Sequence, residues 1–518
     1  MTRPTTIAAL AALLLAGAAH AETLSVAVPA PVTSIDPHYH TLTPNESLDS
    51  SIFERLVDMD PTSHLTPGLA ESWKLVDDHT WELKLRPAKF HDGSDFTSAD
   101  VAYSIDRIPR VKNSPASFQI YTRPIIGMDI VDPRTIRLRT AGVYPLLPTD
   151  LTQVFIIPHT LGPDPATEDF NSGKDAIGTG PYRFVSYRPG DRTELERFDG
   201  YWGQKPRWQH ITYRVISNDA ARTAALLAGD VGFIEAVPTS DAVTLRHDSR
   251  VKLAESVSLR IIFITLDQSR DGPTPFVTGP NGETLAKNPL KDLRVRQALS
   301  LAINRPAIVD RVMEGAAIPA GQFLPPGSYS YVPDLPPPPY DPAKAKALLA
   351  EAGFPNGLRM TIQGPNDRYV NDARIIQTVA QMWSRIGIQT SVDAQPWTNF
   401  VGHANKQDYS AYLLGWGSST GEASNPLRSL IAAFDAKKGF GAANRGRYDN
   451  PAVDALTEQA LATADDDARE KLLQRATRMA MDDVAFIPLH NQKNIWATRA
   501  DLTYTPRADE ETRAQDVR

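Results

Sequence analysis

The sequence predicts an α/β protein of two lobes joined by two crossing strands, and three patterns predict it. Strand-like and helix-like patterns alternate between residues 292 and 416, which is typical of an α/β lobe. Residues 259–266 form a continuous apolar run, typical of a buried strand that leaves the first lobe. Residues 485–490 form a second such run, which can return to the first lobe. An excursion out and back gives two lobes hinged about a cleft, and we expect the lobes to close about residues 262–268 and 485–491.

Composition excludes several classes of protein. The chain has 518 residues, enough for more than one hydrophobic core. It has no cysteine, which excludes disulfides, thiolate metal sites, cysteine catalysis and a lipid anchor on cysteine. The formal net charge is -7 and there is no basic stripe, which argues against nucleic acid or anionic lipid as a partner.

The first 21 residues have the pattern of a signal peptide. Arg3 provides a positive start, an apolar run follows over residues 7–19, and Ala19-His20-Ala21 fits a cleavage site. We expect the mature chain to begin at Glu22. No later stretch is long and apolar enough to suggest a membrane span.

The first half of the chain is expected to be mixed. A strand at 22–28 and a polar loop at 38–45 precede a helix at 46–56. A small α+β insertion follows at 61–169, in which Thr97 and Asp100 form an approximate capping box.

The stretch from Ile177 to Pro206 is predicted to be a hairpin around which the other segments close. Gly178 and Gly180 are expected to supply backbone freedom before Pro181. Strands follow at 182–187 and 193–198, joined by the turn residues 189–191.

In the second half, cap residues mark the helices. Asn218 is expected to cap a helix that ends at Gly229. A helix at 342–352 is expected to have Asp341 as its N-cap, Pro342 at its first position and Gly353 after its end. Further helices are expected at 292–304, 372–386, 427–434 and 465–481, with strands at 358–362, 388–392 and 409–416.

Five blocks of this sequence carry a family resemblance. They are 69–73 (LAESW), 89–101 (KFHDGSDFTSADV), 177–182 with 201–203 (IGTGPY and YWG), 292–305 (DLRVRQALSLAINR) and 340–353 (YDPAKAKALLAEAG). In this order they resemble the bacterial extracellular solute-binding proteins, family 5, the dipeptide, oligopeptide and nickel receptors of ABC importers. The resemblance implies a periplasmic-binding-protein-like fold of two lobes with an extra small domain.

The expected domain division follows from the crossings and the resemblance. It comprises a signal peptide (1–21), lobe I in three pieces (22–60, 170–265 and 485–518), an inserted domain II (61–169) and an α/β lobe III (266–484).

The function implied by the resemblance is a periplasmic receptor that captures peptides or peptide-like solutes by lobe closure. An opine, an oligosaccharide or a metal chelate remains open as the ligand class. No G-x-x-x-x-G-K-[ST] loop is present, so we expect a two-subunit permease with separate ATPase subunits as partner. We expect a monomer without a cofactor, exported to the periplasm and not lipid-anchored.

An enzyme alternative comes from Gly417-Ser-Ser-Thr-Gly421, which matches G-x-S-x-G with Ser419 at its centre. Asp454 and His490 follow in the order of a secreted serine hydrolase. The competing interpretation is a ligand-binding loop at the carboxyl end of a strand, where α/β sheets place ligand sites.

The resemblance also implies two charged ligand contacts. In peptide-binding relatives, an aspartate after the strand corresponding to 409–416 meets the peptide's amino group, and that position is Ser419 here. Glu422 lies three residues on and is the candidate carboxylate. An arginine before the helix corresponding to 372–386 meets the peptide carboxylate in those relatives, and Arg368 is the matching candidate.

Neighbouring residues complete the candidate set. The aromatic residues Tyr369, Trp397 and Trp416 are expected either to stack on the ligand or to pack in the lobe core. Arg428 is expected at the start of a helix facing the cleft, where a ligand anion would neutralise it. The remaining candidates from the same segments are Asn371, Ser418, Thr420 and His490. His38 and His40 are too few for a metal site and are expected to be surface or loop residues.

Overall fold

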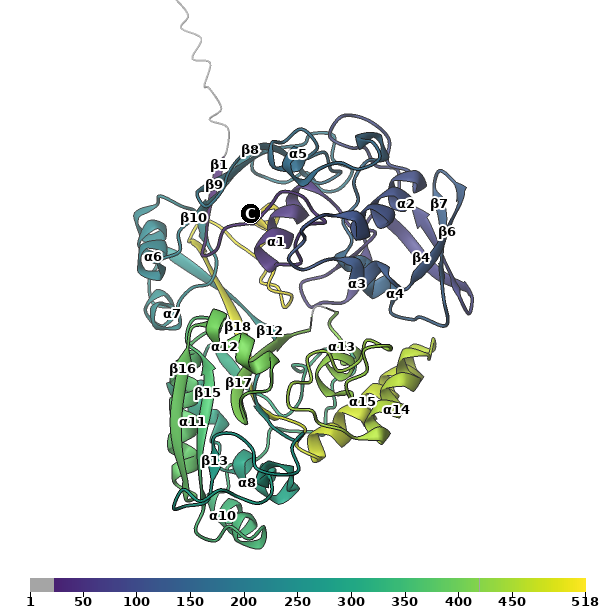
Figure 1. The fold of residues 1–518 in the computed structure, drawn as a ribbon. Helices are drawn as coiled ribbons and strands as arrows, with labels where there is room; N and C mark the ends of the chain where they lie inside the picture. The colour runs from purple at the N-terminus through teal and green to yellow at the C-terminus, as the bar shows by residue number, and fades with distance from the viewer. Residues whose placement is uncertain (1–22, 419) are drawn as a thin grey trace, which may run out of the picture.

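The computed structural model describes residues 23–418 and 420–518, which form an upper and a lower part joined by two long strands (Figure 1). These strands, β12 (Val251–Leu266) and β18 (Ile487–Arg499), are antiparallel neighbours. Within the described ranges, no helix has both the length and the apolar character needed to cross a bilayer. The predicted two-lobed α/β architecture is confirmed. The expected signal peptide lies outside the described residues.

One large mixed sheet runs through both lobes. Its strand order is β13-β15-β17-β12-β18-β11-β1-β10-β9-β8, with β14 on β18 and β16 on β15. The upper strands are β1 (Thr23–Val28), β8 (Tyr182–Arg188), β9 (Arg192–Arg197), β10 (His210–Val215) and β11 (Phe233–Ile234). The lower strands are β13 (Val277–Thr278), β14 (Ala317–Pro319), β15 (Leu358–Pro365), β16 (Ile388–Gln395) and β17 (Ala411–Gly417).

The pairing of β12 with β18 is interrupted where the chain passes between the lobes. Val257 pairs with Lys493, but the next partners are Ile261 and Asn491. In between, Leu259 N–H donates to the Ala508 carbonyl instead, at 3.1 Å. This irregularity precedes residues 262–268, where we expected the first hinge segment. That segment begins within the part of β12 that pairs with β17.

The predicted hairpin, β8 with β9, is confirmed, and its two glycines have a role that the sequence did not reveal. They pack against the end of α1 (Thr43–Ile52). A Cβ on Gly178 would lie 1.9 Å from the Ile52 carbonyl oxygen, and Gly180 N–H donates to that oxygen at 2.9 Å. Neither glycine has a positive φ. Close approach, rather than backbone freedom, therefore requires glycine here.

A separate four-stranded sheet lies within the predicted insertion. Its order is β4 (Ala70–Asp77), β5 (Thr80–Leu85), β7 (Thr135–Thr140) and β6 (Ile125–Asp132). Helix α2 (Ser98–Arg107) packs on it and begins with the predicted capping box, in which Thr97 N–H donates to Asp100 Oδ2 at 2.7 Å. Leu83, Phe96 and Val101 belong to a core that also includes Leu56 and Val57.

Helices cover the sheet in both lobes. The upper helices include α5 (Thr167–Asn171), α6 (Asp219–Ala228) and α7 (Thr239–Leu245). The lower ones include α8 (Leu293–Leu301), α9 (Arg305–Arg311), α10 (Pro342–Glu351), α11 (Asp372–Ser384), α12 (Trp397–Asn405), α14 (Pro451–Leu461) and α15 (Asp466–Asp482). The predicted caps are confirmed, because Asp341 accepts from Lys344 N–H and Gly353 is left-handed at φ 94°.

Three helix predictions need correction. The helix expected at 46–56 starts at Thr43, because Pro44 fits a first turn, and it ends at Ile52. The helix expected at 292–304 ends at Leu301, and a second helix begins at Arg305. The helix expected at 427–434 is a single π-helical turn (Leu427–Ile431), because Ala432 leaves helical geometry.

Candidate ligand-binding site

Several predicted site residues gather at one edge of the lower sheet. Strand β15 is parallel to β16 and to β17, so the three carboxyl ends share an edge. Arg368 follows β15, Trp397 follows β16, and Trp416 lies near the end of β17. The Arg368 guanidinium is 5.4 Å from the Trp397 ring centroid and 5.5 Å from that of Tyr369. Arg368 is exposed, and within 23–418 and 420–518 it forms no ion pair.

The three predicted aromatic residues, Tyr369, Trp397 and Trp416, pack partly in the core of the lower lobe. Tyr369 O–H donates to the Gly415 carbonyl at 3.3 Å, and a Cβ on Gly415 would lie 2.7 Å from the Tyr369 ring. Trp416 Nε1–H donates to Asn425 Oδ1 at 2.8 Å. Tyr369, Trp397 and Trp416 are half-buried against the cores of the lower lobe. Each therefore has one part in the core and another exposed.

Glu422 does not offer the free carboxylate that the sequence led us to expect. Its Oε2 is 2.6 Å from Arg469 Nη1, both side chains are almost fully buried, and Ser424 O–H donates to Oε1. An ion pair inside the lobe therefore replaces the expected contact with a ligand amine. Sequence distance hides this pair, because Arg469 lies 47 residues further along.

The loop after β17 gives the hydrolase alternative no support. Ser418 is buried and donates to the Glu422 carbonyl, and Ser419 lies outside the described residues. Asp454 accepts from Ala433 N–H. His490 is fully buried, and neither ring nitrogen has a hydrogen-bond partner among the described residues. Burial lowers the pKa of His490 to about 3. Asp454 therefore does not orient His490 as a triad requires.

Three other predicted residues have different surroundings. Asn371 donates to Thr239 Oγ1 of α7 and to the Val312 carbonyl, so it links the two lobes. Arg428 faces the inserted region, where its charge opposes the burial that raises the pKa of Asp150 to about 7. The Thr420 hydroxyl is buried without a hydrogen-bond partner in the described part of the chain.

A cavity of about 180 Å³ lies where both lobes and the inserted region meet. Gly417 and Ser418 border it, so it adjoins the loop that the sequence singled out. Its other lining residues are Thr41, Thr43, Glu46, Tyr121, Gln153, Ser258, Leu259, Arg260, Ala508, Asp509 and Glu510. Sequence reasoning missed these residues because they come from distant segments. Arg260 carried the one usable signal, as a charge within an apolar strand.

The charges on the cavity wall are mostly paired. Arg260 donates from Nε and Nη2 to Glu510 at 3.0 and 2.8 Å, and Ser258 O–H donates to the same carboxylate. Burial raises the pKa of Glu510, but Arg260 and then Arg368 lower it, and the net shift is downward. Arg368 therefore lies near enough to influence a group that lines the cavity.

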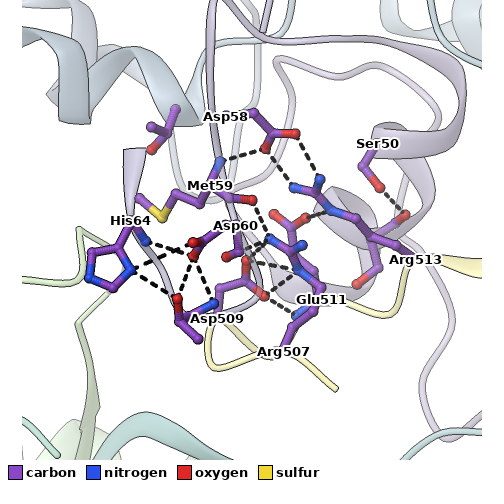
Figure 2. A network of polar contacts seen from close by, with 12 residues as sticks. Ser50, Asp58, Met59, Asp60, His64, Arg507, Asp509, Glu511 and Arg513 are labelled. Carbon is purple, nitrogen blue, oxygen red and sulfur yellow. Dashed lines mark hydrogen bonds and ion pairs between the residues drawn. The ribbon is translucent and has the colours of Figure 1, made fainter. Parts of the chain in front are cut away.

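A buried polar network holds the C-terminal segment against the upper lobe (Figure 2). Arg513 forms two hydrogen bonds to Asp58, at 2.8 and 2.7 Å, and a third to Glu511. Arg55 also donates to Glu511. Burial raises the pKa of Glu511, but Arg55 and Arg513 outweigh it and bring that pKa to about 2. The network thereby positions the neighbouring residues 508–510 at the cavity wall.

A second, larger cavity of about 510 Å³ lies within the upper lobe, lined by residues such as Phe53, Tyr201 and Arg513. No predicted site residue lines it, and no lower-lobe residue does, so the smaller cavity is the candidate ligand site. His38 is buried, contrary to expectation, and hydrogen-bonds Phe155 and Arg107. Among the described residues, no three metal-binding side chains come together.

Known proteins resemble this chain over most of its length. The family described as bacterial extracellular solute-binding proteins, family 5 (middle region) matches residues 64–438. The glutathione-binding protein GsiB of Escherichia coli (strain K12) is 29% identical over 504 residues, covering 95% of this chain and 93% of that protein.

Two solved structures show the same fold. One is the periplasmic binding protein DppA from Helicobacter pylori in complex with the peptide STSA. It has a TM-score of 0.76 and 22% identity, and covers 96% of this chain and 97% of that one. NikZ from Campylobacter jejuni in complex with Ni(L-His) has a TM-score of 0.75 and 22% identity, covering 94% and 95%.

Proposed function

The chain belongs to the bacterial extracellular solute-binding proteins, family 5, the periplasmic receptors of ABC importers, and we propose that its ligands are peptides or peptide-like solutes. The observation that carries the proposal is Arg368, an exposed guanidinium without an ion pair in the described ranges, held over Tyr369 and Trp397. Its charge also acts on Glu510, which lines the cavity. A planar guanidinium matches a carboxylate bidentately. The similarity to a glutathione-binding protein also supports a peptide-like ligand.

In this proposal the receptor is a secreted monomer that takes up its ligand between the lobes and delivers it to a two-subunit permease with separate ATPase subunits. The N-terminal signal pattern and the absence of cysteine support secretion without a lipid anchor. The paired Glu422 and the unoriented His490 favour binding over hydrolysis.

Titration calorimetry with glutathione, the peptide STSA and Ni(L-His) tests the ligand class. We expect at least one of the two peptides to bind and Ni(L-His) not to compete with it. Because a charged hydrogen bond contributes about 1.5–3 kcal/mol, Arg368→Ala should weaken peptide binding roughly ten- to a hundredfold.

The matched control is Arg385→Ala, which removes an exposed arginine at the far end of α11 and should leave the affinity unchanged. Amidating the peptide's C-terminus should weaken binding to the wild type but hardly affect Arg368→Ala. If amidation affects both proteins equally, the carboxylate is held elsewhere. If only Ni(L-His) binds, the peptide assignment is wrong.

A further inference from the structure

The first turn of α1 places one carboxylate, that of Glu46, on the wall of the 180 Å³ cavity. The other walls come from the inserted region and from the strand β12 between the lobes. Gln153 belongs to the inserted region, and Ser258 and Arg260 belong to the strand that crosses between the lobes. The cavity is therefore enclosed by segments that a change in lobe position would move apart.

Glu46 differs from the other acidic residues of the cavity in having no partner. Glu510 is neutralised by Arg260, and Asp509 accepts hydrogen bonds from Arg507 Nε and Nη2. Throughout 23–418 and 420–518, the Glu46 carboxylate has neither a hydrogen bond nor an ion pair. The cavity therefore presents one carboxyl group that has no hydrogen-bond or ion-pair partner among the described residues.

The groups that act on Glu46 explain its electrostatic state. Burial has the largest effect, Glu511 and Asp509 add to it, and Arg55 opposes it, so that the pKa of Glu46 rises to about 7. Arg260 and Glu510 also face the cavity but neutralise each other. A cation that entered would relieve the repulsion and favour the ionised carboxylate.

We propose that this cavity is the subsite for a cationic group of the ligand, with Glu46 of the upper lobe as its counter-charge. The inference rests on the proposed function and replaces Glu422 as the expected acidic contact. A peptide would then span the cleft, with its ammonium group at Glu46 and its carboxylate at Arg368. Because these residues belong to different lobes, such a ligand stabilises the arrangement in which both are close.

The test is calorimetry with STSA and N-acetyl-STSA, and with glutathione and its N-acetyl derivative, on the wild type, Glu46→Gln and Glu351→Gln. The last variant removes the same charge from an exposed position on α10. We expect acetylation to weaken wild-type binding ten- to a hundredfold. Glu46→Gln should bind the free peptides as weakly as the wild type binds the acetylated ones. Its affinity should be the same for the free and the acetylated peptides. Glu351→Gln should match the wild type.

Affinity measured against pH gives an independent readout. Wild-type affinity for the free peptide should rise between about pH 6 and 7.5 as Glu46 ionises, and Glu46→Gln should lose that rise. Thermal unfolding checks the fold, and Glu46→Asp provides a variant that keeps the charge. If Glu46→Gln binds normally and still responds to acetylation, the subsite is wrong and the proposed function stands. If neither peptide binds the wild type, both proposals are overturned.

Discussion

At the scale of single residues, His38 makes stability depend on pH. Its Nε2–H donates to the Phe155 carbonyl at 2.8 Å, and its Nδ1 accepts from Arg107 at 3.1 Å. Burial, and then the charge of Arg107, lower the pKa of His38 to about 4. In the unfolded chain His38 binds a proton near pH 6.5, whereas in the folded chain it binds one only near pH 4. The stabilisation is therefore complete above pH 6.5 and is lost as pH falls towards 4.

We predict that this residue accounts for about 3 kcal/mol of the loss in unfolding free energy over that range. Urea unfolding at several pH values should show a shallower dependence for His38→Asn than for the wild type. His247→Asn, at an exposed position, is the control. An unchanged slope in His38→Asn would contradict the prediction.

How far single residues could be predicted depends on whether their partners are local. Arg368 was proposed from the family resemblance, and Trp397 and Trp416 from their places near the same loops. All three lie where the carboxyl ends of neighbouring strands meet at one edge of the sheet. Glu422 was misinterpreted because its partner Arg469 lies in α15, 47 residues further along the chain. Glu46 left no local signal at all, because the cavity around it forms only when distant segments converge.

At the scale of elements, the contact between the hairpin and α1 is the most sensitive to substitution. Gly178→Ala would place a Cβ 1.9 Å from the Ile52 carbonyl oxygen, and backbone at that point cannot move without shifting the helix end. Overpacking of this kind costs about 2–3 kcal/mol, which should lower the denaturant midpoint. Gly142→Ala, with nothing within 4 Å of its Cβ, should be within about 0.5 kcal/mol of wild type. Equal stability of the two variants would rule out the contact.

Elements with local signals were predictable, whereas lengths set by tertiary contacts were not. Alternation and caps indicated the hairpin, the capping box of α2 and the bracketed helix α10. Strand β12 is longer than predicted, because its polar first half, including Glu255 and Ser256, pairs with β18. The π-helical turn at 427–431 likewise has contacts from beyond its own sequence, since Gly441 N–H donates to the Arg428 carbonyl.

At the scale of the whole molecule, the two lobes share the strands β12 and β18, so a movement between them must bend those strands (Figure 1). The ladder is already interrupted between Val257 and Ile261, where fewer hydrogen bonds resist bending. We therefore expect the hinge there and at residues 491–493, slightly offset from the segments 262–268 and 485–491 inferred from sequence. Hinge motion commonly concentrates in a few residues at the ends of elements.

Closure of the lobes on a ligand is the last prediction. The described state already has contacts between lobes, since Asn371 donates to Thr239 Oγ1 at 3.2 Å. Asn371→Ala should therefore shift the ligand-free protein towards an open state and increase its radius of gyration in solution scattering. Saturation with STSA should reduce that radius for both proteins, because a ligand that contacts both lobes favours the closed state. Asn366→Ala, an exposed change in the loop before α11, is the control. If saturating peptide leaves the radius of the wild type and of Asn371→Ala unchanged, the lobes do not close on this ligand and the strands do not act as a hinge.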